Sequence, residues 1–149
     1  MITFHRTDST NQDFIALVSK LDAYLAITDG EEHAYYAQYN GLDSLRHVVV
    51  AFDDGRAVGC GAIKPYQSDT MEVKRMYVPP EQRGKGIASK LLLELESWAK
   101  ELGFSRCILE TGKRQVEAVG LYHKNAYQLI DNYGQYAKMD NSVCFEKWL

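Results

Sequence analysis

The chain has 149 residues, of which 46% are hydrophobic and 25% charged, and this balance is typical of one globular domain spanning residues 1–149. Its net charge of -3 at pH 7 disfavours nucleic acid as a partner, because a phosphate backbone is bound by a basic face. No apolar run approaches the roughly 20 residues that cross a bilayer. The first residues, MITFHRTDST, show no export signal. We therefore expect a cytoplasmic protein with no membrane partner.

The cysteines and histidines do not suggest a redox or metal site. Cys60, Cys107 and Cys144 are far apart and odd in number, and each lies in an apolar, strand-like segment. This pattern favours reduced thiols in the core of a cytoplasmic protein. No local motif supports a catalytic cysteine, and the four histidines lack metal-ligand spacing. We expect no metal.

The N-terminal quarter predicts a strand and two helices. Residues 2–7 alternate and predict a short strand. Thr10 and Asp13 predict a capping pair for a helix with its apolar face at Phe14, Leu17, Val18, Leu21 and Leu25. Residues 28–40 then predict a turn followed by a second, tyrosine-rich helix.

The next segment predicts a hairpin and a third strand. Residues 46–52 and 56–66 flank the turn Asp53-Asp54-Gly55, which is a strong hairpin signal. Residues 71–78 predict another strand. Pro79 and Pro80 end it, because proline has no N–H to continue a ladder.

A helix and a C-terminal group of elements follow. An apolar stripe at helical spacing predicts a helix that ends at Gly103; the stripe comprises Ile87, Leu91, Leu95, Trp98 and Leu102. Residues 105–111 predict a strand broken by Gly112, residues 114–126 a shorter helix, and residues 127–131 and 142–149 two last strands.

The order of these elements predicts an α/β fold with a mixed sheet. Only the middle of the chain contains a β-α-β unit, so the sheet cannot be fully parallel. A right-handed crossover in that unit places the strand of residues 71–78 beside that of residues 107–111.

The glycine-rich turn at the start of the long helix predicts an anion site. A helix N-terminus exposes unpaired N–H groups, Gly84 and Gly86 leave them accessible, and Arg83 and Lys85 add charge. The dinucleotide fingerprint fails because Ser89 stands at its third glycine, and the ATPase loop pattern is absent. The pattern R-x-x-G-x-[GA] matches. The alternative is a turn with a solvated basic pair.

Three stretches together carry a resemblance that covers nearly the whole chain. They are MEVKRMYVPPEQRGKGIASKLLLELESWAKELGF (residues 71–104), LETG (109–112) and AVGLYHKNAYQLI (118–130). In order and spacing they resemble the GNAT superfamily of acetyl-CoA-dependent N-acetyltransferases. The resemblance implies one N-acetyltransferase domain over residues 1–149. It also implies a mostly antiparallel central sheet that contains one splayed parallel strand pair and is flanked by helices.

The resemblance also implies where acetyl-CoA, as the acyl donor, would bind. The backbone N–H groups of the turn would hold the diphosphate: Arg83, Gly84, Lys85, Gly86, Ile87, Ala88 and Ser89. The exposed main chain of Met76, Tyr77 and Val78 would pair with the pantetheine arm, in a slot left by the splayed strand. Gln115 would either bind the pantetheine or cap its helix.

For the chemistry, the resemblance implies a proton donor and a proton acceptor. Tyr122 would protonate the departing thiolate; the alternative is a ring that only packs on the sheet. Glu72 would take the proton from the amine. Glu110 and ordered water are the other candidates, and either carboxylate could instead pair with a neighbouring cation. Backbone N–H near Met76 or Tyr77 would hold the oxyanion.

The sequence defines the binding site of the acceptor amine less closely than that of the donor. Residues 21–40 carry carboxylates and aromatic rings that suit a cationic amine: Asp22, Asp29, Glu31, Glu32, Tyr24, Tyr35, Tyr36 and Tyr39. The alternative is a helix with a solvated acidic face. Residues 131–143 are candidates for the far wall of the same pocket.

We therefore expect an N-acetyltransferase that moves the acetyl group of acetyl-CoA to a primary amine of a small molecule or peptide. The amine would attack directly in a ternary complex. The alternative is a catalytically silent module that binds or senses acyl-CoA. A homodimer is compatible with the exposed edge strands and the apolar C-terminus.

Overall fold

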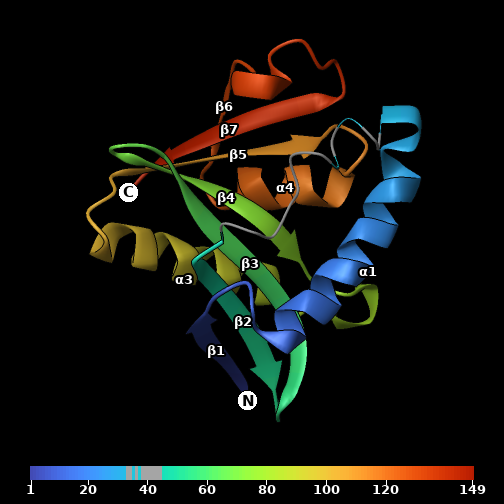
Figure 1. Cartoon of the computed structure of the whole chain (residues 1–149), viewed down its shortest axis with the longest axis vertical. Coiled ribbons are helices and arrows are strands. Elements are labelled where there is room, and N and C mark those ends of the chain that lie inside the picture. Colours follow the sequence, from blue (N-terminus) through green and yellow to red (C-terminus); the bar gives the residue numbers. More distant parts are fainter. Residues whose placement is uncertain (33–34, 36, 38–44) are drawn as a thin grey trace.

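The computed structural model describes residues 1–32, 35, 37 and 45–149, and its centre is a seven-stranded mixed sheet (Figure 1). The spatial order is β1-β2-β3-β4-β5-β7-β6, and every neighbouring pair is antiparallel except β4 and β5. The predicted mixed sheet is confirmed. Its strands are β1 (Ile2–Thr7), β2 (His47–Asp53), β3 (Arg56–Gln67), β4 (Thr70–Tyr77), β5 (Arg106–Gly112), β6 (Gln128–Ile130) and β7 (Ser142–Trp148).

The helices α1 (Gln12–Thr28), α3 (Ile87–Glu101) and α4 (Val116–Lys124) cover the two faces of the sheet. In Figure 1, α1 lies in front of the sheet and α3 and α4 lie behind it. Side chains of β2 pack alternately against the helices on the two faces, because successive side chains of a strand point to opposite faces. Val48 and Val50 pack with α1, whereas Val49 and Ala51 pack with α3. Short 3-10 turns lie at Gly30–Glu32 (η1), Pro80–Gln82 (η2) and Gly134–Tyr136 (η3).

The start of α1 differs from its prediction. The capping residue is Asn11, whose side-chain oxygen accepts a hydrogen bond from the Phe14 N–H at 3.0 Å. The Thr10 hydroxyl instead donates to Asp8. The predicted Thr10–Asp13 capping pair is therefore wrong, because the helix begins at Gln12 and leaves Asn11 in the capping position. The predicted tyrosine-rich helix includes residues 33–34, 36 and 38–40, which lie outside the described residues.

The predicted hairpin and the long helix are confirmed. Asp54 and Gly55 have φ values of +50° and +84° and connect β2 to β3, as a tight hairpin turn requires. Gly103, with φ of +91°, ends α3 just after its C-cap residue Leu102. One member of the apolar stripe was misplaced: Leu102 is 43% exposed, because it lies where the helix ends and no longer faces the sheet.

The parallel pair β4–β5 is joined at one end and open at the other, which confirms the predicted neighbours and their splay. Its pairing runs only from Thr70–Arg106 to Glu72–Ile108, whereas β5 stays paired with β7 as far as Gly112. Beyond Glu72 the two strands diverge, as Figure 1 shows. A bulge near Arg75, whose φ is +59°, shifts the register of β4 against β3 in the same region.

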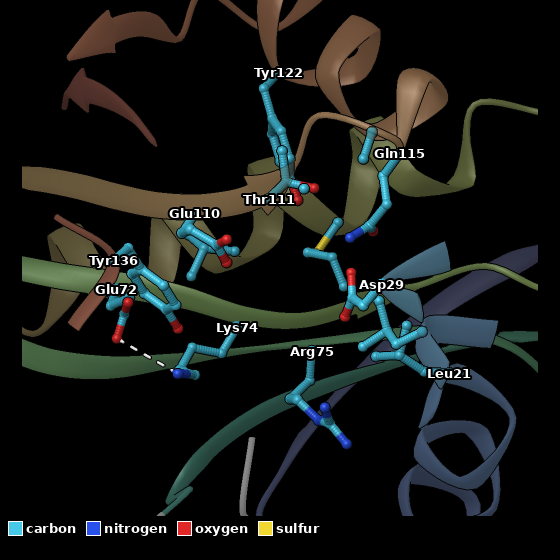
Figure 2. Close-up of a pocket in the computed structure, with 15 residues that line it drawn as sticks. Leu21, Asp29, Glu72, Lys74, Arg75, Glu110, Thr111, Gln115, Tyr122 and Tyr136 are labelled. Atoms are coloured by element: carbon cyan, nitrogen blue, oxygen red, sulfur yellow. Dashed lines mark ion pairs between the residues drawn. The ribbon is translucent and has the colours of Figure 1, made fainter. Parts of the chain in front are cut away.

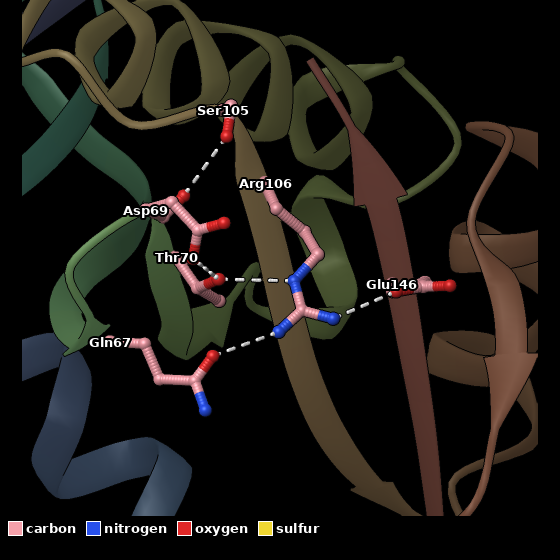
Figure 3. Close-up of polar contacts among 6 residues, drawn as sticks. All are labelled: Gln67, Asp69, Thr70, Ser105, Arg106 and Glu146. Carbon is pink, nitrogen blue, oxygen red and sulfur yellow. Dashed lines mark hydrogen bonds and ion pairs between the residues drawn. The ribbon is translucent and has the colours of Figure 1, made fainter.

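Arg106 holds the joined end together (Figure 3). Its guanidinium donates to Thr70 Oγ1 at 3.0 Å on β4 and to Glu146 Oε1 at 3.0 Å on β7. The Asp69 carbonyl also accepts from the backbone N–H groups of Ser105 and Arg106. This network fixes the strands at their start, so that they separate toward α1 and α4.

No helix in the described residues has both the length and the apolar content needed to cross a bilayer.

Candidate active site

The first cavity, called here the turn cavity, has a volume of about 370 Å³ and lies between the end of β4, the glycine-rich turn and α4. It is lined by every predicted cofactor-binding residue except Lys85: Met76, Tyr77, Val78, Arg83, Gly84, Gly86, Ile87, Ala88, Ser89 and Gln115. The structure therefore brings nearly all of the predicted cofactor-binding residues together around this one cavity.

The glycines of the turn set the direction of its main chain. Gly84 and Gly86 have φ values of +81° and +78°, which lie in the left-handed region that favours glycine. Gly86 is the N-cap of α3, so the backbone N–H groups of residues 87–89 have no acceptor within the helix. Residues 87–89 line the turn cavity, and the helix dipole makes this end attractive to an anion.

The two basic residues of the turn differ in position. Arg83 extends across the turn cavity: its Nε donates to the Val78 carbonyl at 2.9 Å, and its guanidinium pairs with Glu117 at 2.8 Å. It also lies over the Tyr24 ring, 5.7 Å from the centroid. Lys85 is exposed and donates to Gln82 at 2.9 Å. Of the two, Arg83 is the cation that faces the cavity directly.

A second, smaller cavity of about 100 Å³ adjoins the first, and we call it the acidic compartment (Figure 2). Its charged lining comprises Asp29, Glu72, Lys74, Arg75 and Glu110. The two cavities share five lining residues: Leu21, Met76, Gln115, Ala118 and Tyr122. A molecule in one cavity can therefore contact a molecule in the other at this boundary, which lies where β4 and β5 diverge.

Tyr122 of α4 stands at the boundary of the two cavities. Its ring packs near Phe145 and Tyr127, with centroid distances of 5.9 and 5.8 Å, and its side chain runs from α4 toward Thr111 (Figure 2). Burial raises the pKa of Tyr122, and the negative charge of Glu110 raises it further. The hydroxyl is therefore protonated at neutral pH, so packing of the ring is compatible with proton donation.

The two candidate bases have different surroundings. Burial raises the pKa of Glu110 to about 7, although a hydrogen bond from Ser142 at 2.8 Å opposes this shift. Glu72 is 6% exposed and both its oxygens have partners: Oε2 accepts from the Tyr133 hydroxyl at 2.6 Å, and Oε1 lies 3.8 Å from Lys74 Nζ. A proton acceptor works best with a pKa near the working pH. Glu110 has that property.

The acidic residues that were proposed to bind the acceptor do not all lie in one place in the structure. Asp29, at the C-terminus of α1, is 4% exposed and lines the acidic compartment. Asp22 pairs with Arg75 at 2.7 Å, and Glu32 lies 3.8 Å from Arg114. Tyr24 lines the turn cavity rather than the acidic compartment.

Several residues of the compartment were not named individually as site residues. Lys74 and Tyr136 line it, while Tyr133 and Ser142 bond to its carboxylates. The signal for Lys74 was its spacing from Glu72, because alternate residues of a strand share a face. The others belong to residues 131–143, which were proposed as the far wall of the acceptor pocket. Of these residues, Tyr136 lines the compartment.

The cysteines are free and buried, as expected for core thiols. Burial raises the pKa of the Cys60 and Cys107 thiols to about 12 and that of Cys144 to about 11. These thiols stay protonated at neutral pH and are poor nucleophiles. Within the described residues, no cluster of histidine, cysteine or carboxylate side chains could hold a metal ion.

Comparison with known proteins identifies the relatives of this chain. Residues 14–127 match the sequence model of the acetyltransferase (GNAT) family. An IAA acetyltransferase from Azospirillum brasilense is 32% identical over 98% of this chain and 97% of its own. A Klebsiella pneumoniae protein assigned as an acyl-CoA N-acyltransferase is 32% identical, with a TM-score of 0.84 over 100% of this chain and 98% of its own.

A more distant structure shares the fold. PaiA N-acetyltransferase from Thermoplasma acidophilum, solved in complex with coenzyme A, is 20% identical and has a TM-score of 0.74. The match covers 100% of this chain and 99% of the other. The arrangement of sheet and helices is thus that of N-acetyltransferases, and the resemblance seen in the sequence is confirmed.

Proposed function

Because this chain belongs to the acetyltransferase (GNAT) family, we propose that it transfers the acetyl group of acetyl-CoA to a primary amine by direct attack in a ternary complex. The acceptor would be a small molecule or a peptide. One observation carries the proposal: a cavity at a helix N-terminus adjoins a carboxylate-lined compartment, and Tyr122 stands at their boundary. The first suits a diphosphate and the second suits an amine.

The turn cavity would hold acetyl-CoA along its main chain. The diphosphate binds to the N–H groups of residues 86–89, where the helix dipole and Arg83 favour an anion. The pantetheine arm pairs with residues 76–78 in the manner of an added strand. Arg83 must then release the Val78 carbonyl, which is where the arm would bond. The thioester reaches Tyr122 at the boundary.

The acidic compartment would receive the amine and take its proton. Glu110 accepts that proton, because its raised pKa lets it exist in both forms near neutral pH. The amine nitrogen attacks the thioester carbon, and N–H groups near Met76 or Tyr77 hold the oxyanion. The C–S bond then breaks, and Tyr122 donates its proton to the coenzyme thiolate.

Glu72 would have a supporting part in this scheme. Its oxygens already bind Tyr133 and face Lys74, so its carboxylate fixes two other side chains of the compartment. An incoming amine would have to displace one of these partners to bond to Glu72. Glu110 is therefore the better candidate for the base, and Glu72 for a positioning residue.

The test is the release of free thiol from acetyl-CoA in the presence of a panel of amines. The panel contains polyamines, amino acids, aminoglycosides and short peptides, each measured with and without protein. We expect amine-dependent thiol release with at least one class and mass-spectrometric detection of the acetylated amine. Tight binding of acetyl-CoA without thiol release for any class would contradict transfer and favour a silent acyl-CoA-binding module.

A further inference from the structure

Lys74 places a primary amine of the chain itself inside the acidic compartment. Its side chain is 9% exposed and lines the cavity, where its Nζ lies 3.8 Å from Glu72 Oε1 (Figure 2). An acceptor substrate would bring the same chemical group to the same compartment. Lys74 is therefore the part of the protein that most resembles the acceptor.

The position of Lys74 on β4 brings it within reach of the thioester. Lys74 precedes Met76 by two residues, and Met76 lines both cavities. Lys74 and Tyr122 also line the same cavity, whose volume is only about 100 Å³. Rotation about the side-chain bonds of Lys74 would move its ammonium through this small compartment toward the boundary.

The surroundings of Lys74 shift its titration toward the reactive, neutral amine. Burial lowers the pKa of Lys74, and the neighbouring cations Lys64 and Arg75 act in the same direction. The carboxylates of Glu72 and Glu110 oppose that shift. The same carboxylates can accept the proton that the amine must lose, and the compartment thus supplies both a nucleophile and a base.

We propose that Lys74 is a self-acetylation site, at which the protein transfers the acetyl group of bound acetyl-CoA to its own amine. This inference rests on the proposed function. The ammonium first gives one proton to Glu110. Its nitrogen attacks the thioester carbon, the C–N bond forms and the C–S bond breaks. Tyr122 protonates the leaving thiolate, and the second proton of the nitrogen then passes to the Tyr122 oxygen, so that the nitrogen ends as an amide N–H and Tyr122 as a hydroxyl. The products are an amide at Lys74 and free coenzyme A, and no other reactant is needed.

Acetylation of Lys74 would change the compartment in two ways. It removes the positive charge beside Glu72 and adds an acetyl group to a cavity of about 100 Å³. The modified protein should still bind acetyl-CoA, because the turn cavity is unaffected. Transfer to an added amine should fall. Self-acetylation therefore acts as a brake when acetyl-CoA is present without acceptor.

The experiment follows acetylation of each lysine in the unmodified protein by peptide mass spectrometry over time. Acetyl-CoA is the first donor and acetic anhydride, which needs no binding site, is the second. Lys20, an exposed residue of α1, is the reference. With acetyl-CoA, Lys74 should react at least about 10²-fold faster than Lys20, because binding holds the reacting atoms together. With acetic anhydride, the buried Lys74 should react more slowly than Lys20.

Two further arms separate this inference from the proposed function. Desulfo-coenzyme A should raise the melting temperature and protect Lys74. Lys74→Arg should keep the charge and abolish the rapid phase, whereas Lys20→Arg should leave it unchanged. If desulfo-coenzyme A binds but Lys74 reacts no faster than Lys20, self-acetylation is wrong and the proposed function stands. If the protein binds no coenzyme analogue, both fail. Faster reaction of Lys74 with both donors also overturns the inference, because the selectivity then needs no bound coenzyme.

Discussion

The turn cavity and the acidic compartment adjoin, yet they are built in different ways. The turn cavity has about 370 Å³ and is lined by one continuous segment, residues 76–89, together with residues of α1 and α4. The acidic compartment has about 100 Å³ and is lined by residues of α1, β4, β5, α4 and η3. The first has a local segment at its centre, whereas the second is assembled from segments far apart in the sequence.

This difference separates the two parts of the proposed reaction. A site built from backbone N–H groups binds what many proteins share, here a diphosphate and an amide-containing arm. In a site built from side chains of distant segments, a single substitution can change which ligand is bound. The donor site and the acceptor site should therefore respond to different mutations.

The largest expected effect is that of Tyr122→Phe on catalysis. The change removes one hydroxyl and keeps the ring, so packing against Phe145 and Tyr127 should survive. We expect kcat to fall by about 10²- to 10⁴-fold, the usual contribution of a general acid, with little change in acetyl-CoA affinity. Steady-state kinetics and calorimetry measure the two quantities. A near-normal kcat would reduce Tyr122 to a packing residue. A large loss of affinity would make Tyr122 a cofactor contact.

The next effect is that of Gly86→Val on donor binding. Valine is strained at a φ of +78°, and its side chain would enter the site of the diphosphate. The acetyl-CoA dissociation constant should rise by roughly 10³-fold, equivalent to losing two charge-assisted hydrogen bonds. Gly103→Val is the matched control, because φ is +91° there and the residue lies at the other end of α3. Equal losses of binding in both variants would count against the turn as the diphosphate site.

The acidic compartment is tested by comparing Glu110→Gln with Glu72→Gln. For Glu110→Gln we expect kcat/KM to fall by about 10²-fold, as for loss of a general base. A base must be deprotonated, so wild-type kcat/KM should fall as pH drops through about 7, the pKa of Glu110. This pH dependence should vanish in Glu110→Gln and persist in Glu72→Gln. The opposite result would return the role of base to Glu72.

The smallest effect is expected for Glu117→Gln, at the mouth of the turn cavity. The carboxylate is 75% exposed and holds Arg83 at 2.8 Å. Exposed ion pairs contribute at most about 1 kcal/mol, so acetyl-CoA affinity should rise by no more than about 5-fold as Arg83 becomes available to the diphosphate. Acceptor KM should not change. Weaker acetyl-CoA binding would show that Glu117 positions Arg83 for the ligand.

The two regions also explain what the sequence could predict. The strand ending at Pro79, the glycine turn and the helix from Ile87 are local signals, and each was found in the structure. Tyr122 and Glu110 were named from the family resemblance. The partners that distinguish Glu110 from Glu72, Ser142 and Tyr133, come from a segment that follows both in the chain. No local pattern specifies such pairs, because they depend on which strands become neighbours.

The sequence predictions failed where local pattern alone does not decide the position of a residue. Asn11 and Thr10 are both good helix caps, and only the observed start of α1 decides between them. Leu102 fits the apolar period of α3 but lies beyond the last turn that faces the sheet. Lys74 was not named as a site residue. Its place inside the compartment became clear only with the divergence of β4 and β5.

The most direct test of this account is a crystal structure of the protein with acetyl-CoA. The diphosphate should lie against the N–H groups of residues 86–89, and Arg83 should have left the Val78 carbonyl. The thioester sulfur should lie within hydrogen-bonding distance of the Tyr122 hydroxyl, and the acetyl group should face the acidic compartment. A coenzyme whose sulfur lies away from Tyr122, or whose acetyl group points to solvent, would contradict the claim that the two cavities form one reaction site.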